Sequence, residues 1–130
     1  MNIRFEYLYR DASNYLRRGA VVFGDPDRLA SCLSDQENRL HRLLMVDSIF
    51  SAHQVRLPEL FLYAAGTASS DDHCLHEFFG LEATTDQSDD PLERSFSQFL
   101  DEIEEASRNG WLGFDPHSSA LVRGYFGFSA

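Results

Sequence analysis

The chain has 130 residues, 43% of them hydrophobic, with eleven phenylalanines, five tyrosines and one tryptophan. That is enough for one domain with a substantial core, and it excludes a multi-domain assembly. Against 21 acidic residues stand 11 arginines and no lysine, so the formal charge is −10. Because a charge of this sign repels phosphate, we expect no direct binding to nucleic acid or to an anionic membrane.

The cysteines and the N-terminal residues predict a cytoplasmic protein. Cys32 and Cys74 form no C-x-x-C pair, and two isolated thiols are typical of a reducing compartment. The first residues lack the basic and apolar regions of a signal peptide, and no apolar run is long enough for a membrane span.

The N-terminal segment predicts a β-hairpin. Apolar side chains alternate with polar ones over 3–10, which is the pattern of a half-buried strand. Turn residues follow at 11–14, and 15–23 has the composition of a second strand, in which we expect Gly19 to form a bulge. The run Gly-Asp-Pro-Asp at 24–27 ends the hairpin.

Leucines at helical spacing predict a helix from Leu29 to Leu44. Two starts compete: a capping box of Ser34 with Glu37, and Asp25 placed before a proline. Beyond this helix we expect strands over 48–55 and 60–63, then a polar loop over 64–70.

The second half predicts one strand and one helix. We expect the strand over 73–82 and a solvated linker over 84–90. An apolar stripe from Leu92 to Ala106 predicts the helix, with Gly110 in the position of its C-terminal cap.

This element order predicts an α+β fold, with an antiparallel or mixed sheet of about five strands and two helices packed on one face. We expect residues 1–110 to form a single α+β domain. Residues 111–130 are rich in glycine and aromatics and form a C-terminal extension, of which 120–126 could add an edge strand to the same domain.

The densest polar cluster, at 71–77, contains the candidate metal ligands. If it is a strand, alternation places Asp72, Cys74 and His76 on one face and His73 on the other. A carboxylate, a thiolate and an imidazole suit zinc or another divalent metal. The alternative is a strand that begins at a polar turn and uses its histidines in hydrogen bonds.

The negative charge is concentrated in one segment. Residues 71–105 contain twelve acidic residues and one arginine, whereas eight acidic residues and eight arginines balance over 1–70. We take the acidic residues before and on the second helix as a candidate binding surface, with a solvated helix face as the alternative. They are Asp89, Asp90, Asp101, Glu102, Glu104 and Glu105.

Several stretches resemble a widespread family of short bacterial proteins of uncharacterised function. They are the start Tyr-Leu-Tyr-Arg-Asp-Ala-Ser-Asn-Tyr at 7–15, the run at 19–23, the stretch 55–63 and Asp-His-Cys-Leu-His-Glu-Phe at 72–78. The resemblance covers most of 1–110 and implies a compact cytosolic bacterial or phage-borne domain. It implies no particular activity and no site residues.

The sequence contains no G-x-S-x-G elbow, phosphate-binding loop or dinucleotide fingerprint, so we assign no catalytic residue and no cofactor. We expect a non-enzymatic, acidic protein-interaction module that inhibits a basic partner, as immunity proteins, antitoxins and phage anti-defence proteins do. The partner would be a nuclease, a toxin or a nucleic-acid-binding complex. The alternatives are a metal-binding or metal-dependent hydrolytic domain at the 71–77 cluster and a structural or scaffolding subunit that uses the aromatic tail.

Overall fold

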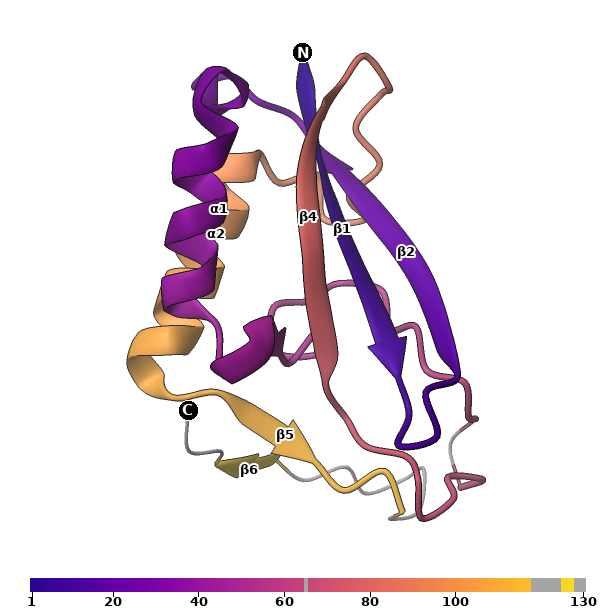
Figure 1. Ribbon diagram of the computed structural model, residues 1–130. Helices are drawn as coiled ribbons and strands as arrows, with labels where there is room; N and C mark the ends of the chain where they lie inside the picture. The colour runs from indigo at the N-terminus through magenta and orange to yellow at the C-terminus, as the bar shows by residue number, and fades with distance from the viewer. Residues whose placement is uncertain (65, 118–124, 128–130) are drawn as a thin grey trace.

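The computed structural model describes residues 1–64, 66–117 and 125–127, the last three by their backbone (Figure 1). Its strands are β1 (Asn2–Arg10), β2 (Leu16–Phe23), β3 (Ile49–Phe50), β4 (His76–Thr84), β5 (Leu112–Phe114) and β6 (Tyr125–Gly127). Its helices are α1 (Leu33–Leu43) and α2 (Phe96–Asn109), with short 3₁₀ turns η1 (Leu29–Cys32) and η2 (Val46–Ser48).

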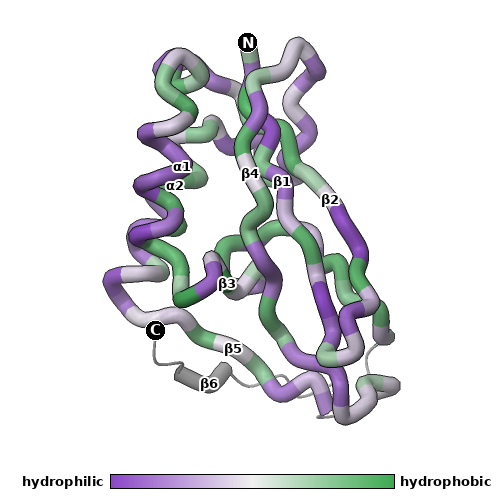
Figure 2. Tube along the Cα trace, in the orientation of Figure 1, coloured by the Kyte–Doolittle hydropathy of each residue, from purple (hydrophilic) through white to green (hydrophobic). Residues whose placement is uncertain are grey.

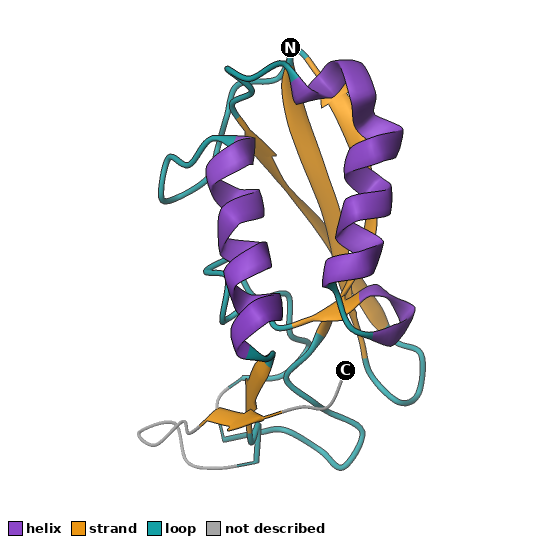
Figure 3. Cartoon of the chain, turned by 90° about the vertical axis from the view of Figure 1, so that its left-hand side faces the viewer, coloured by secondary structure: helices purple, strands orange, loops and turns teal. Residues whose placement is uncertain are grey.

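Four strands form one antiparallel sheet in the order β2-β1-β4-β3. Both helices cover the same face of this sheet (Figures 1 and 3). The α+β class, the antiparallel sheet and the placement of the helices are therefore as predicted. The predicted five strands do not lie in one sheet, because β5 pairs with β6 in a separate two-stranded sheet.

The hairpin of β1 and β2 is confirmed, but the predicted bulge at Gly19 is wrong. Gly19 pairs regularly with Tyr7. A Cβ at this position would lie 2.8 Å from a methyl carbon of Leu60, so the Leu60 side chain would have to shift. The register shift lies on the other side of β1, between β1 and β4 at Glu6 and Tyr7.

The helix predicted from Leu29 begins as η1 and continues as α1. Neither predicted start is the N-cap: η1 begins at Leu29 after Arg28, and Pro26 lies in a turn. The Asp25 carboxylate nevertheless accepts hydrogen bonds from the backbone N–H groups of Leu29 and Ala30 at 2.9 and 2.8 Å. The capping box of Ser34 and Glu37 does not form, because Glu37 instead accepts a hydrogen bond from the N–H of Leu81 on β4.

The middle of the chain contains less strand than predicted. Only Ile49 and Phe50 of the predicted strand 48–55 pair with β4, and 60–63 is a loop. The backbone of this loop bonds to side chains instead of to a neighbouring strand. The N–H of Leu60 donates to Nε2 of His76 at 2.9 Å, and the carbonyl of Phe61 accepts from Arg17 at 3.4 Å. Just before the loop, Tyr7 donates to the carbonyl of Pro58 at 2.5 Å.

The predicted second helix is confirmed as α2, although it begins later than its apolar stripe suggested. Ser95 is the N-cap, and it forms a capping box with Gln98 in which each side chain binds the other residue's backbone N–H. Leu92 lies before the helix and is 44% exposed. Gly110, with φ of 95°, ends the helix as expected.

The main core lies between the sheet and the helices, and alternating hydropathy along the strands is visible in Figure 2. Trp111 belongs to this core, and its indole N–H donates to the carbonyl of Leu43 at 3.1 Å. Phe114 belongs to a second, smaller core with Tyr9, Phe61 and Cys74. The first residues of the C-terminal extension thus pack against elements from the rest of the chain.

The predicted edge strand over 120–126 lies largely outside the described residues. Its last two residues belong to β6, which pairs with β5 and not with the four-stranded sheet. In the described part of the chain, neither helix has the length and apolar character needed to cross a membrane.

Candidate functional site

The six acidic residues predicted as a binding surface do not form one free patch. Asp90 is 5% exposed and lies next to Arg94 in the interior. Asp89 is exposed, but its Oδ1 accepts a hydrogen bond from the N–H of Val22 at 2.7 Å. Both residues therefore hold the segment before α2 in place.

Arg94, the only arginine in the acidic segment, organises several of its carboxylates. Its guanidinium donates two hydrogen bonds to Asp90 at 2.9 and 3.0 Å and one to Glu102 at 2.7 Å. It also donates to the carbonyls of Val55 and Arg56, so the loop after β3 is tied to α2. Burial pushes the pKa of Asp90 upward, but the hydrogen bonds from Arg94 outweigh it, so this pKa lies below its ordinary value.

Glu102 and Glu104 pair with arginines from the first half of the chain. Glu102 forms an ion pair with Arg56 in addition to Arg94. Glu104 binds Arg39 of α1 at 2.7 Å and lies 3.6 Å from Arg108 on its own helix. These two carboxylates link α2 to its neighbours, and their charge is largely compensated.

The same compensation extends along the acidic segment. Arg4 pairs with Glu82 and Asp86, and Arg10 pairs with Glu77. Four arginines of residues 1–70 therefore neutralise carboxylates of residues 71–105: Arg4, Arg10, Arg39 and Arg56. The segment that carries the net charge of the chain also joins its two halves.

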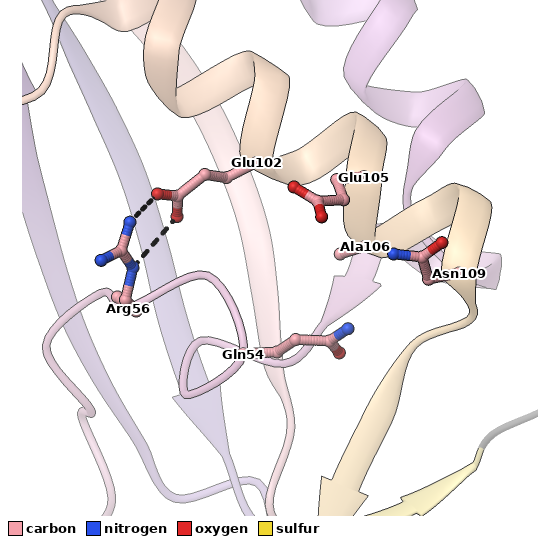
Figure 4. Close-up of a pocket in the computed structure, with 6 residues that line it drawn as sticks. All are labelled: Gln54, Arg56, Glu102, Glu105, Ala106 and Asn109. Carbon is pink, nitrogen blue, oxygen red and sulfur yellow. Dashed lines mark hydrogen bonds and ion pairs between the residues drawn. The ribbon is translucent and has the colours of Figure 1, made fainter.

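Asp101 and Glu105 are the two predicted residues that remain as exposed carboxylates without a partner in the described part of the chain. Glu105 lines a groove of about 280 Å³ between α2 and the loop after β3 (Figure 4). The lining residues are Gln54, Arg56, Glu102, Glu105, Ala106 and Asn109.

The groove has fixed walls. Gln54 donates to the carbonyl of Gly110 at 3.3 Å and accepts from the N–H of Leu112 at 2.7 Å, so both ends of its amide are held. Arg56 is anchored by Glu102, as the dashed lines in Figure 4 show. Glu105 and Asn109 lie one helical turn apart on α2 and offer acceptor oxygens to hydrogen-bond donors.

The four candidate metal ligands occupy different surroundings. Asp72 accepts hydrogen bonds from the Tyr9 hydroxyl at 2.6 Å and from the N–H of Ser69 at 2.9 Å. Burial raises the pKa of Asp72, but these hydrogen bonds lower it by more, so this pKa lies below its ordinary value. Nδ1 of His73 accepts a hydrogen bond from the N–H of Leu75. The proton of the neutral ring is therefore on Nε2, which donates to the carbonyl of Arg10 at 2.7 Å.

Cys74 belongs to the smaller core, and His76 is buried beside aromatic residues of both cores. Cys74 is 3% exposed, and burial raises the pKa of its thiol. His76 is 1% exposed, and its ring lies 4.9 Å from that of Phe61 and 5.8 Å from those of Tyr7 and Tyr9, measured between centroids. Within 1–64, 66–117 and 125–127, no three His, Cys, Asp or Glu side chains are arranged to hold a metal ion.

Several groove residues carried no sequence signal. Gln54, Arg56 and Asn109 are ordinary polar residues, and the two walls of the groove lie about fifty positions apart in the chain. The single arginine among twelve acidic residues was visible in the sequence, and it marks Arg94 as the centre of the ion pairs.

Comparisons of the chain with protein-family models, with curated proteins and with solved structures found no match in any of the three.

Proposed function

We propose that this chain is a non-enzymatic protein-interaction module that binds a basic partner through the groove between α2 and the loop after β3. The supporting observation is that Asp101 and Glu105 keep exposed carboxylates while their neighbours are compensated. Glu105 lies in a groove of about 280 Å³, and this volume suits one arginine or lysine side chain of the partner.

The partner we propose is a nuclease, a toxin or a nucleic-acid-binding complex. Proteins of this kind carry basic surfaces that hold phosphates, and carboxylates on a rigid helix can occupy the same positions. Opposite charge also speeds association well above the rate of neutral partners. The role would then be that of an immunity protein, an antitoxin or a phage anti-defence inhibitor. Free thiols at Cys32 and Cys74 agree with action in the cytoplasm.

The experiment is a titration of this protein with basic toxins or nucleases encoded beside it. We expect binding that weakens strongly between about 50 and about 500 mM salt, because the attraction is screened. The double variant Asp101→Arg and Glu105→Arg should lose at least about tenfold in affinity, or about 1.4 kcal/mol.

The matched control is Asp47→Arg, an exposed carboxylate in η2, outside the groove, which should leave binding unchanged. Affinity that is insensitive to salt, or an equal loss in the control, would contradict the proposal. Glu102 and Glu104 are unsuitable for this test, because reversing them breaks ion pairs of the fold.

A further inference from the structure

The outer edge of β2 is open along its first half. The register of β1 and β2 and the alternation of backbone groups direct the N–H and C=O groups of Leu16, Arg18 and Ala20 away from β1. In the part of the chain that the structure describes, these groups have no backbone partner. β2 is the last strand at its side of the sheet (Figure 1), so these groups are available to another strand.

The second half of the same edge is already covered by an acidic segment of this chain. The N–H of Asp89 donates to the carbonyl of Val22 at 3.0 Å, and its carboxylate accepts the N–H of Val22 at 2.7 Å. Ser95 forms a parallel bridge with Gly24 just beyond. At this edge the outward N–H and C=O of Val22 are thus satisfied by one backbone N–H and one carboxylate of the same acidic residue.

The charge of the open half favours an acidic occupant. Of the ten arginines within the described residues, six pair with carboxylates: Arg4, Arg10, Arg39, Arg56, Arg94 and Arg108. Arg17 and Arg18 do not, although the chain has 21 acidic residues. Arg17 reaches the carbonyl of Phe61 at 3.4 Å, and Arg18 stacks over the ring of Phe79 at 4.9 Å. β2, on which both arginines lie, includes a hydrophilic stretch in Figure 2.

A hollow of mixed polarity lies beside this edge on the face of the sheet opposite the helices. It measures about 310 Å³ and is lined by Glu6, Tyr7, Arg18, Gly19, Ala20 and Phe79. Phe79 is 58% exposed, and Leu16 at the start of β2 is 38% exposed. A strand added next to β2 would direct every second side chain toward this face.

We propose that the edge of β2 from Leu16 to Ala20 binds an extended acidic segment of a partner protein by β-strand addition. Main-chain hydrogen bonds to residues 16, 18 and 20 supply the affinity. Arg17, on the face toward the helices, selects carboxylates, and an apolar side chain on the opposite face of the segment enters the hollow beside Arg18 and Phe79. A second copy of this chain fits poorly, because antiparallel pairing of two β2 edges would bring Arg17 and Arg18 against the same arginines. This surface shares no residue with the α2 groove.

The probe is a short capped peptide of alternating valine and glutamate, compared with the same peptide carrying lysine in place of glutamate. Backbone amides of the protein are followed by NMR and hydrogen exchange. In the free protein we expect fast exchange at Leu16, Arg18 and Ala20 and slow exchange at Arg17, Gly19 and Val21. The glutamate peptide should slow exchange at the first three, whereas the lysine peptide should not.

Two variants test the two parts of the proposal. Ala20→Pro removes one outward N–H and leaves the ladder with β1 intact, because proline is tolerated at such edge positions. Arg17→Glu with Arg18→Glu reverses the charge. Each variant should lower the affinity for the glutamate peptide by about tenfold or more. Arg42→Glu, at an exposed arginine of α1, should leave this affinity unchanged.

Equal binding of both peptides, or unchanged binding by either variant, would overturn the proposal. The proposal would also be overturned if sedimentation showed that the wild-type protein is a dimer and that Ala20→Pro dissociates it. The edge would then bind a second copy of this chain. If Ala20→Pro does not fold, the charge-reversal variant and the exchange pattern of the wild-type protein still decide the question.

Discussion

His76 should make the stability of this protein fall between pH 7 and pH 5. The ring is 1% exposed, and its Nε2 accepts the N–H of Leu60, so the proton of the neutral ring is on Nδ1. Nδ1 is buried without a hydrogen-bond partner among the described residues. Burial, with a smaller contribution from nearby His73, lowers the pKa of His76 from 6.5 to about 3.

The sign and size of the effect follow from this shift. Between pH 6.5 and pH 3 the unfolded chain binds a proton at His76 that the folded protein does not bind, so acid favours unfolding. The stability that the neutral, buried His76 ring contributes is complete above pH 6.5 and is lost as the pH falls toward 3. At pH 5 the loss amounts to about 2 kcal/mol relative to pH 7, a large part of the stability of a small domain.

The assay is urea unfolding at pH 7 and pH 5, followed by the fluorescence of Trp111, which is buried in the main core. His76→Gln is the matched variant, because an amide oxygen can accept the N–H of Leu60 but does not titrate. We expect the wild-type protein to lose about 2 kcal/mol more than the variant over this interval. Carboxylates contribute little above pH 5, and the opposing effect of His117, whose pKa is raised, is present in both proteins.

The reasoning would be refuted by equal pH dependence in the two proteins. It would also be refuted by ring nitrogen shifts showing that His76 in the folded protein takes up a proton near pH 6. The second measurement needs only the wild-type chain, so it remains decisive if the variant is too unstable to study.

Three further predictions concern the fold and the metal hypothesis. Arg94→Met should destabilise the protein by about 3–5 kcal/mol in urea unfolding, because the Asp90 carboxylate is left buried without its partner, and Asp90→Asn in the same chain should recover part of the loss. Gly19→Ala should cost about 1–3 kcal/mol through the contact with Leu60, and Leu60→Ala should relieve the overlap. Elemental analysis of untagged protein should show no stoichiometric zinc, and a chelator should leave the melting temperature unchanged; bound metal with a lowered melting temperature on its removal would favour a metal centre at the 71–77 cluster instead.

Local patterns in the sequence were sufficient for much of the fold. Alternation over residues 3–10, interrupted at Leu8, predicted β1, and the apolar stripe of α2 predicted the second helix. In each case the periodicity results from one buried face, so the sequence of that segment alone is enough to reveal it. The short apolar run at 60–63 was misread as a strand, because it too is buried in part, but its backbone bonds to the side chains of Arg17 and His76.

The candidate site was predicted only in part. Asp101 and Glu105 were among the predicted acidic residues and are the two that remain exposed without a partner in the described chain. Asp90, Glu102 and Glu104 look the same in the sequence, yet each binds an arginine in the folded protein. Two of these arginines, Arg39 and Arg56, come from other segments of the chain, so no local pattern could identify them.

Composition and periodicity alone determined that this is an acidic α+β domain, that residues 71–105 carry its negative charge and that two helices cover a sheet. The tertiary structure decided which of those charges are free. It pairs the acidic segment with arginines from the first half of the chain, and it leaves Asp101 and Glu105 exposed on α2 and Arg17 and Arg18 at the edge of β2. The reason is physical: a net charge is a sum over residues, whereas the field that a partner meets depends on which opposite charges folding has brought together.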